Sequence, residues 1–351
     1  NGRYEIIFDS VSAPNTVMPG PSRYPQSIWQ SIAAYLNHEY RQSDKLTLQG
    51  GIRYNHFLLE ADFSSNADFY PIPFDMAKID NGAVTGSIGV VYKPKESWII
   101  KTNFGTAFRS PNVDDVGKVF DSEPGSVVVP NADLEAEYAY SFDLGIAKRF
   151  SDRVKVDVSG YYTILHNAMV RRDFQVSGQD SIVYDGTLSR VQALQNAAAA
   201  NVYGIQAGFE INLSNGFTFL TDVNYQVGEE ELDNGSTSPS RHAAPLFGIS
   251  RFRYQTSDLT LELNTIFQGK KSHGDLAVSE RGKTEIYALD NNGNTYSPAW
   301  YTLNFKSTYQ FTETLGLSAG IENITDQRYR PYSSGLSGPG RNFVFSLRAN
   351  F

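Results

Sequence analysis

The chain has 351 residues, is 13% aromatic and 40% hydrophobic, and carries a formal net charge of −8. No stretch approaches the roughly 18 consecutive apolar residues of a membrane helix, and disordered chains lack so many aromatic side chains. The absence of cysteine excludes a disulfide framework and thiolate chemistry, while the negative charge gives no overall attraction to nucleic acid. Because the chain opens at Asn1 without a Met or an apolar signal core, we expect a processed protein or a fragment.

Strict alternation of apolar and polar residues is the main pattern along the chain. Val154, Val156 and Val158 fall on one face of a predicted strand, whereas Lys155 and Asp157 fall on the other. The same alternation predicts strands over residues 203–213, 217–227, 259–267, 301–311 and 341–351. Each of these strands has one apolar and one polar face, and each is longer than the five or six residues of an ordinary strand.

Short and long connections alternate between the predicted strands. The tight connections lie at residues 41–45, 94–97, 151–153, 214–216, 256–258 and 312–314. Long polar segments lie at residues 9–27, 61–81, 110–135, 170–198, 229–244, 271–298 and 331–339. Aromatic residues stand beside nearly every tight turn: Tyr92, Trp98, Phe150, Phe217, Tyr254, Phe311 and Phe351. Transmembrane β-barrels sort their loops by length in this way and carry aromatic girdles at the headgroup level.

These patterns predict an all-β fold, a transmembrane antiparallel β-barrel with about fourteen strands, counting a partial strand over Tyr4 to Phe8. Strands in lipid leave no backbone group unpaired only when their sheet closes on itself. The apolar face would meet lipid, and the charged residues of the polar face would point inward: Lys155, Asp157, Glu210, Asp222, Glu262, Lys306, Glu322 and Arg348. A soluble β-rich carbohydrate-binding domain is the competing class, and it would fold without detergent.

Several segments resemble motifs of one family. Phe108-Arg109-Ser110-Pro111-Asn112, followed by the segment Pro130 to Glu137, resembles two boxes of the TonB-dependent outer-membrane receptors. The segments 321–329 and 340–343 are similar to the last hairpin of that family, and 241–248 resembles a strand-start element. In the boxes, the resemblance implies mainly structural roles for Phe108, Arg109, Pro111, Asn131, Leu134 and Glu137.

The resemblance also implies an architecture and a set of partners. Barrels of this family have 22 strands, a size whose lumen holds a plug. Residues 1–351 would then be the C-terminal portion of the barrel, with 22 − 14 = 8 strands and the plug domain absent. The whole receptor would be multi-pass in the bacterial outer membrane, would not be an enzyme, and would import its ligand with energy that TonB delivers through the missing plug. A stand-alone passive pore of fourteen strands is the alternative.

Three further partners follow from the same resemblance. These are outer-membrane lipid, the barrel-assembly machinery, which would recognise the C-terminal Phe351, and a surface lipoprotein that captures the ligand. Nucleic acid is not expected as a partner.

The ligand is expected to be an iron complex. The ending from Tyr329 to Gly335 resembles most closely the haem, haemoglobin and transferrin branch of the family, which implies haem or a ferric siderophore as transported ligand, with no resident cofactor or metal. Residues 112–129, where haem receptors of this type place a histidine, contain none. Candidate ligand-binding residues in the loops are Arg171, Arg172, Tyr184, Arg190, His242, His273, Tyr287 and Tyr296. Arginine suits anionic groups of ferric chelates, tyrosine stacks or donates hydrogen bonds, and imidazole can bind haem iron.

Overall fold

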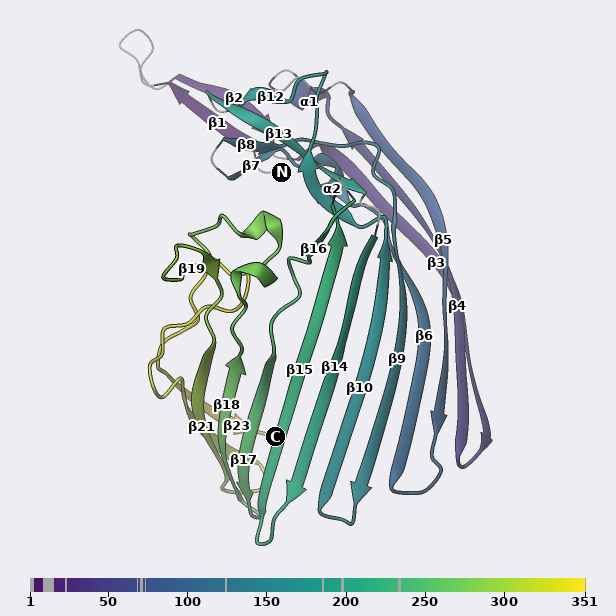
Figure 1. Ribbon diagram of the computed structural model, residues 1–351, viewed down its shortest axis with the longest axis vertical. Helices are drawn as coiled ribbons and strands as arrows, with labels where there is room; N and C mark the ends of the chain where they lie inside the picture. Colours follow the sequence, from purple (N-terminus) through teal and green to yellow (C-terminus); the bar gives the residue numbers. More distant parts are fainter. Residues whose placement is uncertain are drawn as a thin grey trace.

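One large antiparallel sheet dominates the computed structural model, which describes residues 3–8, 16–22, 24–67, 69, 72, 74–123, 125–184, 186–196, 199–232 and 235–350. The sheet has 14 strands, which confirms the predicted all-β class and strand number. Thirteen strands follow one another across it (Figure 1): β3 (Gln26–Ser43), β4 (Leu46–Asp62), β5 (Met76–Tyr92), β6 (Trp98–Arg109), β9 (Glu137–Phe150), β10 (Val154–His166), β14 (Ala199–Asn212), β15 (Phe217–Glu231), β17 (Phe247–Gln255), β18 (Leu259–Gln268), β21 (Trp300–Gln310), β22 (Leu315–Glu322) and β23 (Asn342–Ala349). The fourteenth, β16 (Thr237–Pro239), pairs with β15.

The prediction that Tyr4 to Phe8 is a partial strand of this sheet is wrong. Strand β1 (Arg3–Phe8) pairs instead with β2 (Thr16–Ser22) in a separate two-stranded sheet. The two strands are close in sequence, so a local pairing satisfies the β1 backbone without the large sheet.

Tight turns and long connections sit at opposite ends of the large sheet, as predicted (Figure 1). The tight turns join β3 to β4, β5 to β6, β9 to β10, β14 to β15, β17 to β18 and β21 to β22. Asn215 and Gly216 form one of them with φ of 61° and 84°. Asn and Gly are favoured in hairpin turns with positive φ, because that backbone twist matches the strands they join. We call the two ends the tight-turn end and the long-loop end.

The two faces of the sheet differ in polarity as the alternation predicts. Tyr203, Ile205 and Phe209 project from one face of β14 and are 40%, 55% and 37% exposed. On the opposite face, the Arg251 guanidinium lies 3.0 Å from the Asp222 carboxylate, and cross-strand ion pairs of this kind stabilise a sheet. The apolar face is suited to lipid and the polar face to a wet interior.

Aromatic residues mark the tight-turn end on the apolar face. Tyr92, Phe150 and Phe311 are 43%, 46% and 54% exposed there. The ammonium group of Lys148 lies 4.4 Å from the Trp98 ring centroid and 4.2 Å from that of Phe150. A lysine that keeps its charge among rings at the membrane surface is typical of a girdle at headgroup depth.

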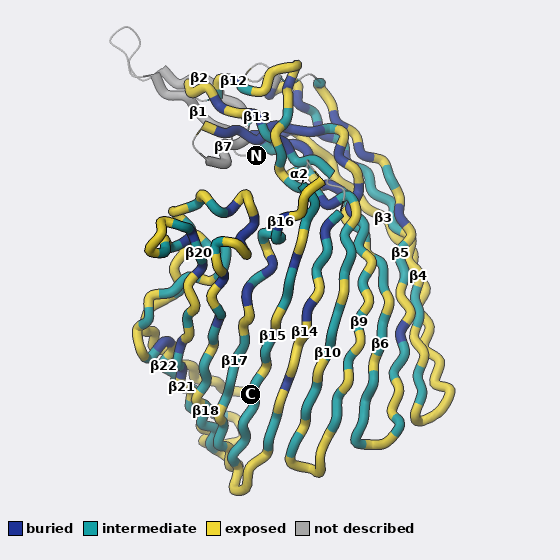
Figure 2. The backbone as a smooth tube through the Cα atoms, viewed as in Figure 1, coloured by how far each residue is buried: buried dark blue, intermediate teal, exposed yellow. Residues whose placement is uncertain are grey.

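A second sheet lies at the long-loop end, where the sequence predicts only loops. It contains β7 (Phe120–Glu123), β8 (Ser126–Val128), β11 (Met169–Asp173), β12 (Ser181–Tyr184) and β13 (Thr187–Asn196). Segment 170–198 is therefore largely strand. Its residues Val176, Ile182, Val191 and Ala193 form one hydrophobic core with Val119, Val127 and Val129 of the preceding long connection. Figure 2 shows buried segments gathered at this end, whereas the tight turns are exposed.

Near the long-loop end, strands β4 and β5 separate from β6 and the strands that follow it in the large sheet. Strand β5 pairs with β4 over its full length, but its ladder with β6 ends at Ser87 and Gly105. At this fork the Thr106 hydroxyl accepts a hydrogen bond from the Gly86 N–H (2.9 Å) and donates one to the Gly86 carbonyl (3.3 Å). One side chain thus satisfies both backbone groups of Gly86, the first residue of β5 beyond the end of this ladder.

The helices are short: α1 (Ser64–Ala67), α2 (Val113–Gly117), and the 3-10 helices η1 (His273–Asp275) and η2 (Val278–Glu280). None of the helices in the described residues is long and apolar enough to cross a membrane. A two-stranded sheet of β19 (Ala288–Leu289) and β20 (Thr295–Tyr296) completes the long-loop end.

Candidate functional site

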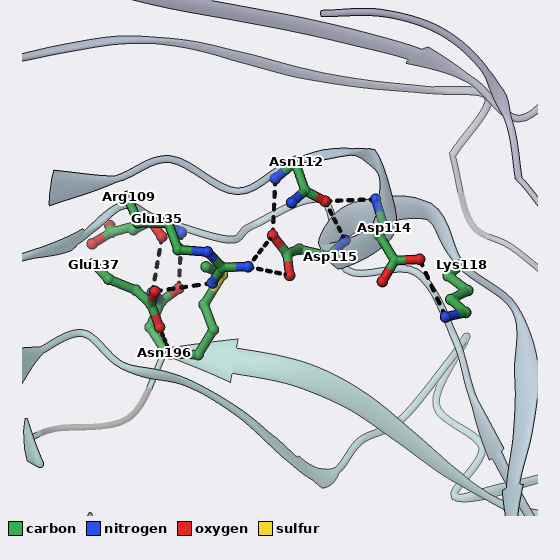
Figure 3. Close-up of polar contacts among 9 residues, drawn as sticks. Arg109, Asn112, Asp114, Asp115, Lys118, Glu135, Glu137 and Asn196 are labelled. Atoms are coloured by element: carbon green, nitrogen blue, oxygen red, sulfur yellow. Dashed lines mark hydrogen bonds and ion pairs between the residues drawn. The ribbon is translucent and has the colours of Figure 1, made fainter. Parts of the chain in front are cut away.

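The first motif box is organised by Arg109, the last residue of β6. Its Nη2 donates to both carboxylate oxygens of Asp115 at 2.7 Å, and its Nη1 donates to Glu137 at 2.9 Å (Figure 3). The second Glu137 oxygen accepts from the Met169 N–H at 2.6 Å. Charge-assisted hydrogen bonds from one guanidinium to two carboxylates fix the geometry of the groups they join as well as adding energy. Arg109 therefore ties β6 to α2 and β9, which is the arrangement expected of a structural motif.

The helix α2 begins at a complete capping box. The Asn112 side chain accepts from the backbone N–H groups of Asp114 and Asp115, and the Asp115 carboxylate accepts from the Asn112 N–H (Figure 3). Reciprocal bonds of this kind satisfy N–H groups that have no partner within the helix. Pro111, just before the cap, is fully buried.

The second motif box, residues 130–137, packs against β4 and β5 where these strands separate from β6. Leu134 is 5% exposed and joins Leu59, Ile79 and Val116 in one hydrophobic cluster. The Asn131 amide donates to the Leu194 carbonyl at 2.8 Å, which connects this box to β13. Beside it, the Phe108 ring contacts those of Phe57 (5.0 Å) and Tyr138 (5.6 Å). The contacts of both boxes are thus directed to neighbouring protein elements. Phe351, the last motif residue, lies outside the described residues.

Four of the eight predicted ligand-binding residues lie on the second sheet. Arg171 and Arg172 are on β11, Tyr184 is on β12 and Arg190 is on β13. Arg190 forms an ion pair with Asp173, and Tyr184 packs against the core of this sheet. The Arg172 guanidinium donates to the Glu231 carbonyl at 2.7 Å, so it links the second sheet to the top of β15.

The other four lie in the connections β16–β17 and β18–β21. His242 is exposed, whereas the His273 ring is held by Thr295, with Nδ1 3.1 Å from its carbonyl. Lys270 lies over the Tyr296 ring at 4.7 Å, and Tyr287 is 4% exposed. The eight residues therefore occupy two loop assemblies and do not converge as a single set. In the described part of the chain, no group of three or more His, Asp or Glu side chains is arranged to hold a metal ion.

A fully buried carboxylate, Glu280, holds the β18–β21 connection in place. It lies 3.0 Å from the Arg241 guanidinium and 2.8 Å from the Lys283 ammonium, and it accepts a hydrogen bond from the Tyr287 hydroxyl at 2.8 Å. Burial, followed by the bond to Glu280, raises the pKa of Tyr287, so the phenol stays protonated and continues to donate.

A third connection, β22–β23, is locked to the same assembly. The Tyr332 N–H donates to the Gln268 side chain at 3.0 Å, and burial raises the pKa of Tyr332 to about 12. The Lys271 ammonium lies 4.8 Å from the Tyr332 ring and donates to the Ala243 carbonyl. Segments 237–246, 269–299 and 327–339, which we call the latched loops, therefore form one interlocked unit.

A cavity of about 420 Å³ opens within the latched loops. Its lining comprises Thr284, Ile286, Tyr287, Ala288, Ser297, Pro298, Ala299, Trp300, Gln327, Arg328, Tyr329, Arg330, Pro331, Ser333 and Ser337. Tyr287 is the one predicted residue among them. Reasoning from sequence missed Trp300, Arg328 and Ser333, which are close only because three connections fold together. The available signal was the Tyr329-Arg330 run that carries part of the family resemblance.

Comparison with known proteins identifies the family. Residues 2–324 match the family model described as TonB dependent receptor-like, beta-barrel. The chain is 22% identical to the pesticin receptor of Yersinia pestis over 90% of this chain and 42% of that protein. It is 23% identical to the probable TonB-dependent siderophore receptor PiuA of Acinetobacter baumannii over 92% of this chain and 41% of that protein. A hemoglobin-haptoglobin-binding protein of Haemophilus influenzae is 22% identical over 76% of this chain and 27% of its own length.

The fold is also similar to that of solved structures. The copper transporter OprC superposes with a TM-score of 0.72 at 15% identity, over 93% of this chain and 48% of that chain. This chain spans about two fifths of the length of the first two relatives. The relatives are named for different ligands, so they indicate no single ligand branch. The chain belongs to the TonB-dependent receptor β-barrel family, whose members are transporters of the bacterial outer membrane.

Proposed function

We propose that this chain is the C-terminal wall and loop region of an active-transport receptor that binds an iron complex, haem or a ferric siderophore, and imports it with TonB energy. The latched loops carry this proposal, because they form a preorganised unit with a cavity at the long-loop end. Preorganisation lowers the entropic cost of binding a ligand. The names of the siderophore and haemoglobin-binding relatives support an iron complex as the ligand.

Strand direction weighs against the alternative of a passive pore. In the described part of the chain, the thirteen successive strands alternate in direction, so β3 and β23 both run toward the tight-turn end. These two edges would meet in parallel, whereas transmembrane barrels of this type close with antiparallel pairs and an even strand number. Closure therefore needs an odd number of further strands. In a 22-stranded barrel, 22 − 13 = 9 further strands would close the sheet. The sequence predicts eight absent strands, and the difference arises because β1 is not part of the large sheet.

The proposal assigns different chemistry to the two loop assemblies. His242 and His273 are the proposed axial ligands if the iron complex is haem, and the arginines of β11 and β13 would meet anionic groups of a chelate. TonB would act through a plug, the barrel-assembly machinery would recognise Phe351, and a surface lipoprotein would deliver the ligand.

Uptake of radioactive iron tests the transport proposal. Cells without other iron receptors, expressing the full-length receptor, should accumulate iron from haem or from a ferric catecholate when TonB is present and lose this uptake when TonB is deleted. Equal uptake with and without TonB would contradict active transport and favour a pore. In the purified receptor, a Soret shift with haem that His242→Ala or His273→Ala abolishes would select haem, and its absence would select a siderophore.

A further inference from the structure

We propose that Lys148, together with the rings of Trp98 and Phe150, forms a binding site for the phosphate of an anionic phospholipid in the leaflet at the tight-turn end. The short turns of outer-membrane barrels lie on the periplasmic side, so this is the periplasmic leaflet. Such a site lies outside the proposed function, because it takes a lipid that surrounds the wall and not the transported ligand. Strand register, the surroundings of one ammonium group and the charge of a neighbouring turn support it.

Strand register places Lys148 on the apolar face of the large sheet. Lys148 lies opposite Trp98 on β6 and opposite Val156 on β10, so these three side chains share that face. In the described strands of the large sheet, the lysines and arginines otherwise fall on the polar face, with Lys78 as the second exception. The Lys78 ammonium lies near the long-loop end, 3.2 Å from the Glu60 carboxylate on the same face. A basic residue that faces lipid is tolerated where its charge reaches the headgroups.

The charge of Lys148 is held at headgroup depth without being neutralised. Lys148 lies two residues from the end of β9, and its ammonium lies 4.4 Å from the Trp98 ring centroid and 4.2 Å from that of Phe150. Aromatic rings attract a cation but leave its net charge unchanged. In the part of the chain that the structure describes, Lys148 forms no ion pair with a carboxylate, whereas Lys155 on the polar face of β10 lies 3.3 Å from Asp157. At this depth, lipid phosphate is the anion that can neutralise Lys148.

The turn that joins β5 to β6 adds positive charge beside Trp98. The Trp98 N–H donates to the Lys95 carbonyl at 3.0 Å, so the turn directly adjoins the residue that faces Lys148. The turn carries two exposed lysines, Lys93 and Lys95, against one carboxylate, Glu96. The turn that joins β21 to β22 at the same end contains an acidic and no basic residue. Positive charge is therefore concentrated at the β5–β6 and β9–β10 part of the rim, where it attracts anionic lipid.

Quenching of Trp98 fluorescence by brominated lipids tests the site. The full-length receptor is reconstituted into phosphatidylcholine vesicles that contain increasing fractions of brominated phosphatidylglycerol or, in a parallel series, of brominated phosphatidylcholine. The emission that Trp98→Phe removes reports on Trp98 alone. Half-maximal quenching should need about fivefold less brominated phosphatidylglycerol than brominated phosphatidylcholine, since one lysine near a membrane surface contributes roughly this factor in affinity for anionic lipid. Equal fractions of the two lipids would overturn the proposed site.

Substitutions of lysine assign the lipid preference to one residue. Lys148→Gln should remove the preference for phosphatidylglycerol, whereas Lys148→Arg keeps the charge and should retain it. Lys101→Gln is the matched control, because Lys101 lies on the same strand as Trp98 but on the polar face, and this variant should behave like the wild-type protein. A preference that persists in Lys148→Gln, or that disappears equally in Lys101→Gln, would contradict the site. Loss of the preference in Lys148→Arg as well would show that packing and not charge selects the lipid.

Inorganic phosphate distinguishes a lipid site from a site for a free anion. Phosphate added at constant ionic strength should leave the quenching by brominated phosphatidylglycerol unchanged, because the lipid is held by its acyl chains as well as by its phosphate. Relief of quenching by phosphate but not by chloride would overturn the assignment to a lipid. The measurement uses neither TonB nor a transported ligand, so its outcome is independent of the proposed function.

Discussion

Replacement of the buried Glu280 carboxylate by an amide should release the latched loops. Glu280→Gln keeps the side-chain shape, but it removes the negative charge that pairs with Arg241 at 3.0 Å and with Lys283 at 2.8 Å. Loss of one member of a buried ion pair typically costs about 3–5 kcal/mol, because the remaining charge is left uncompensated.

The lower end of that range applies to this site. The side chains of Arg241 and Lys283 are 41% and 22% exposed, so both recover some hydration when their partner is lost. We therefore expect the free energy of local opening to fall by about 3 kcal/mol. Since about 1.4 kcal/mol corresponds to a factor of ten, exchange-competent opening of the latched loops should become roughly a hundredfold more frequent.

Hydrogen exchange of the purified receptor, measured by mass spectrometry at one pH, reads this change directly. Peptides from all three segments, 237–246, 269–299 and 327–339, should exchange faster together, because the segments are interlocked. Glu285→Gln is the matched control, since Glu285 is an exposed carboxylate on the same connection. Exchange within about threefold of wild type, or acceleration confined to the residues around 280, would refute the role of Glu280 as the common anchor.

Three further predictions concern the wall, the motif box and pH. Ile205→Arg places a charge on the apolar face and should make the free energy of membrane insertion about 2–4 kcal/mol less favourable, whereas Gln206→Arg on the polar face should be tolerated. If the two variants showed equal heat-modifiable gel mobility, the assigned faces would be contradicted. Arg109→Ala removes three charge-assisted bonds and should speed proteolysis within 110–136, and an unchanged cleavage rate would show that the box is held by packing alone. Hydrogen bonds from backbone N–H groups of the following turn lower the pKa of Asp290. The ionised Asp290 therefore stabilises the turn fully at a pH above the carboxyl pKa in the unfolded chain, about 3.9, and this stabilisation is lost as the pH falls through the lower pKa of the folded protein. Pepsin cleavage of this turn should rise over that range, and Asp290→Asn should remove the pH dependence.

Much of the large sheet could be predicted because period-two alternation and turn residues are local signals. Val154, Val156 and Val158 already define the apolar face of β10, and residues 214–216 predict the hairpin turn that joins β14 to β15. The strands of segment 170–198 were missed, because no long alternation marks them and because β13 also pairs with β8, which lies in another connection.

The candidate site was the least predictable part for the same reason. Tyr287 was selected as a polar loop residue, but its buried contact with Glu280 depends on how the β18–β21 connection folds back. Trp300 lies just before the predicted strand 301–311, and its part in a cavity follows only from the approach of the β22–β23 connection. Arg109 and Asn131 were recognised as motif residues, whereas the helix cap between them required the coordinates.

The fork at Gly86 has a mechanical consequence. Where two strands separate, the last pair of a ladder carries the load of any motion above it, and unzipping normally proceeds from that point. The Thr106 hydroxyl engages both the N–H and the carbonyl of Gly86, so the load is shared with a side chain that belongs to the neighbouring strand. The hairpin of β4 and β5 therefore separates from β6 at a point where a side chain reinforces the end of the ladder.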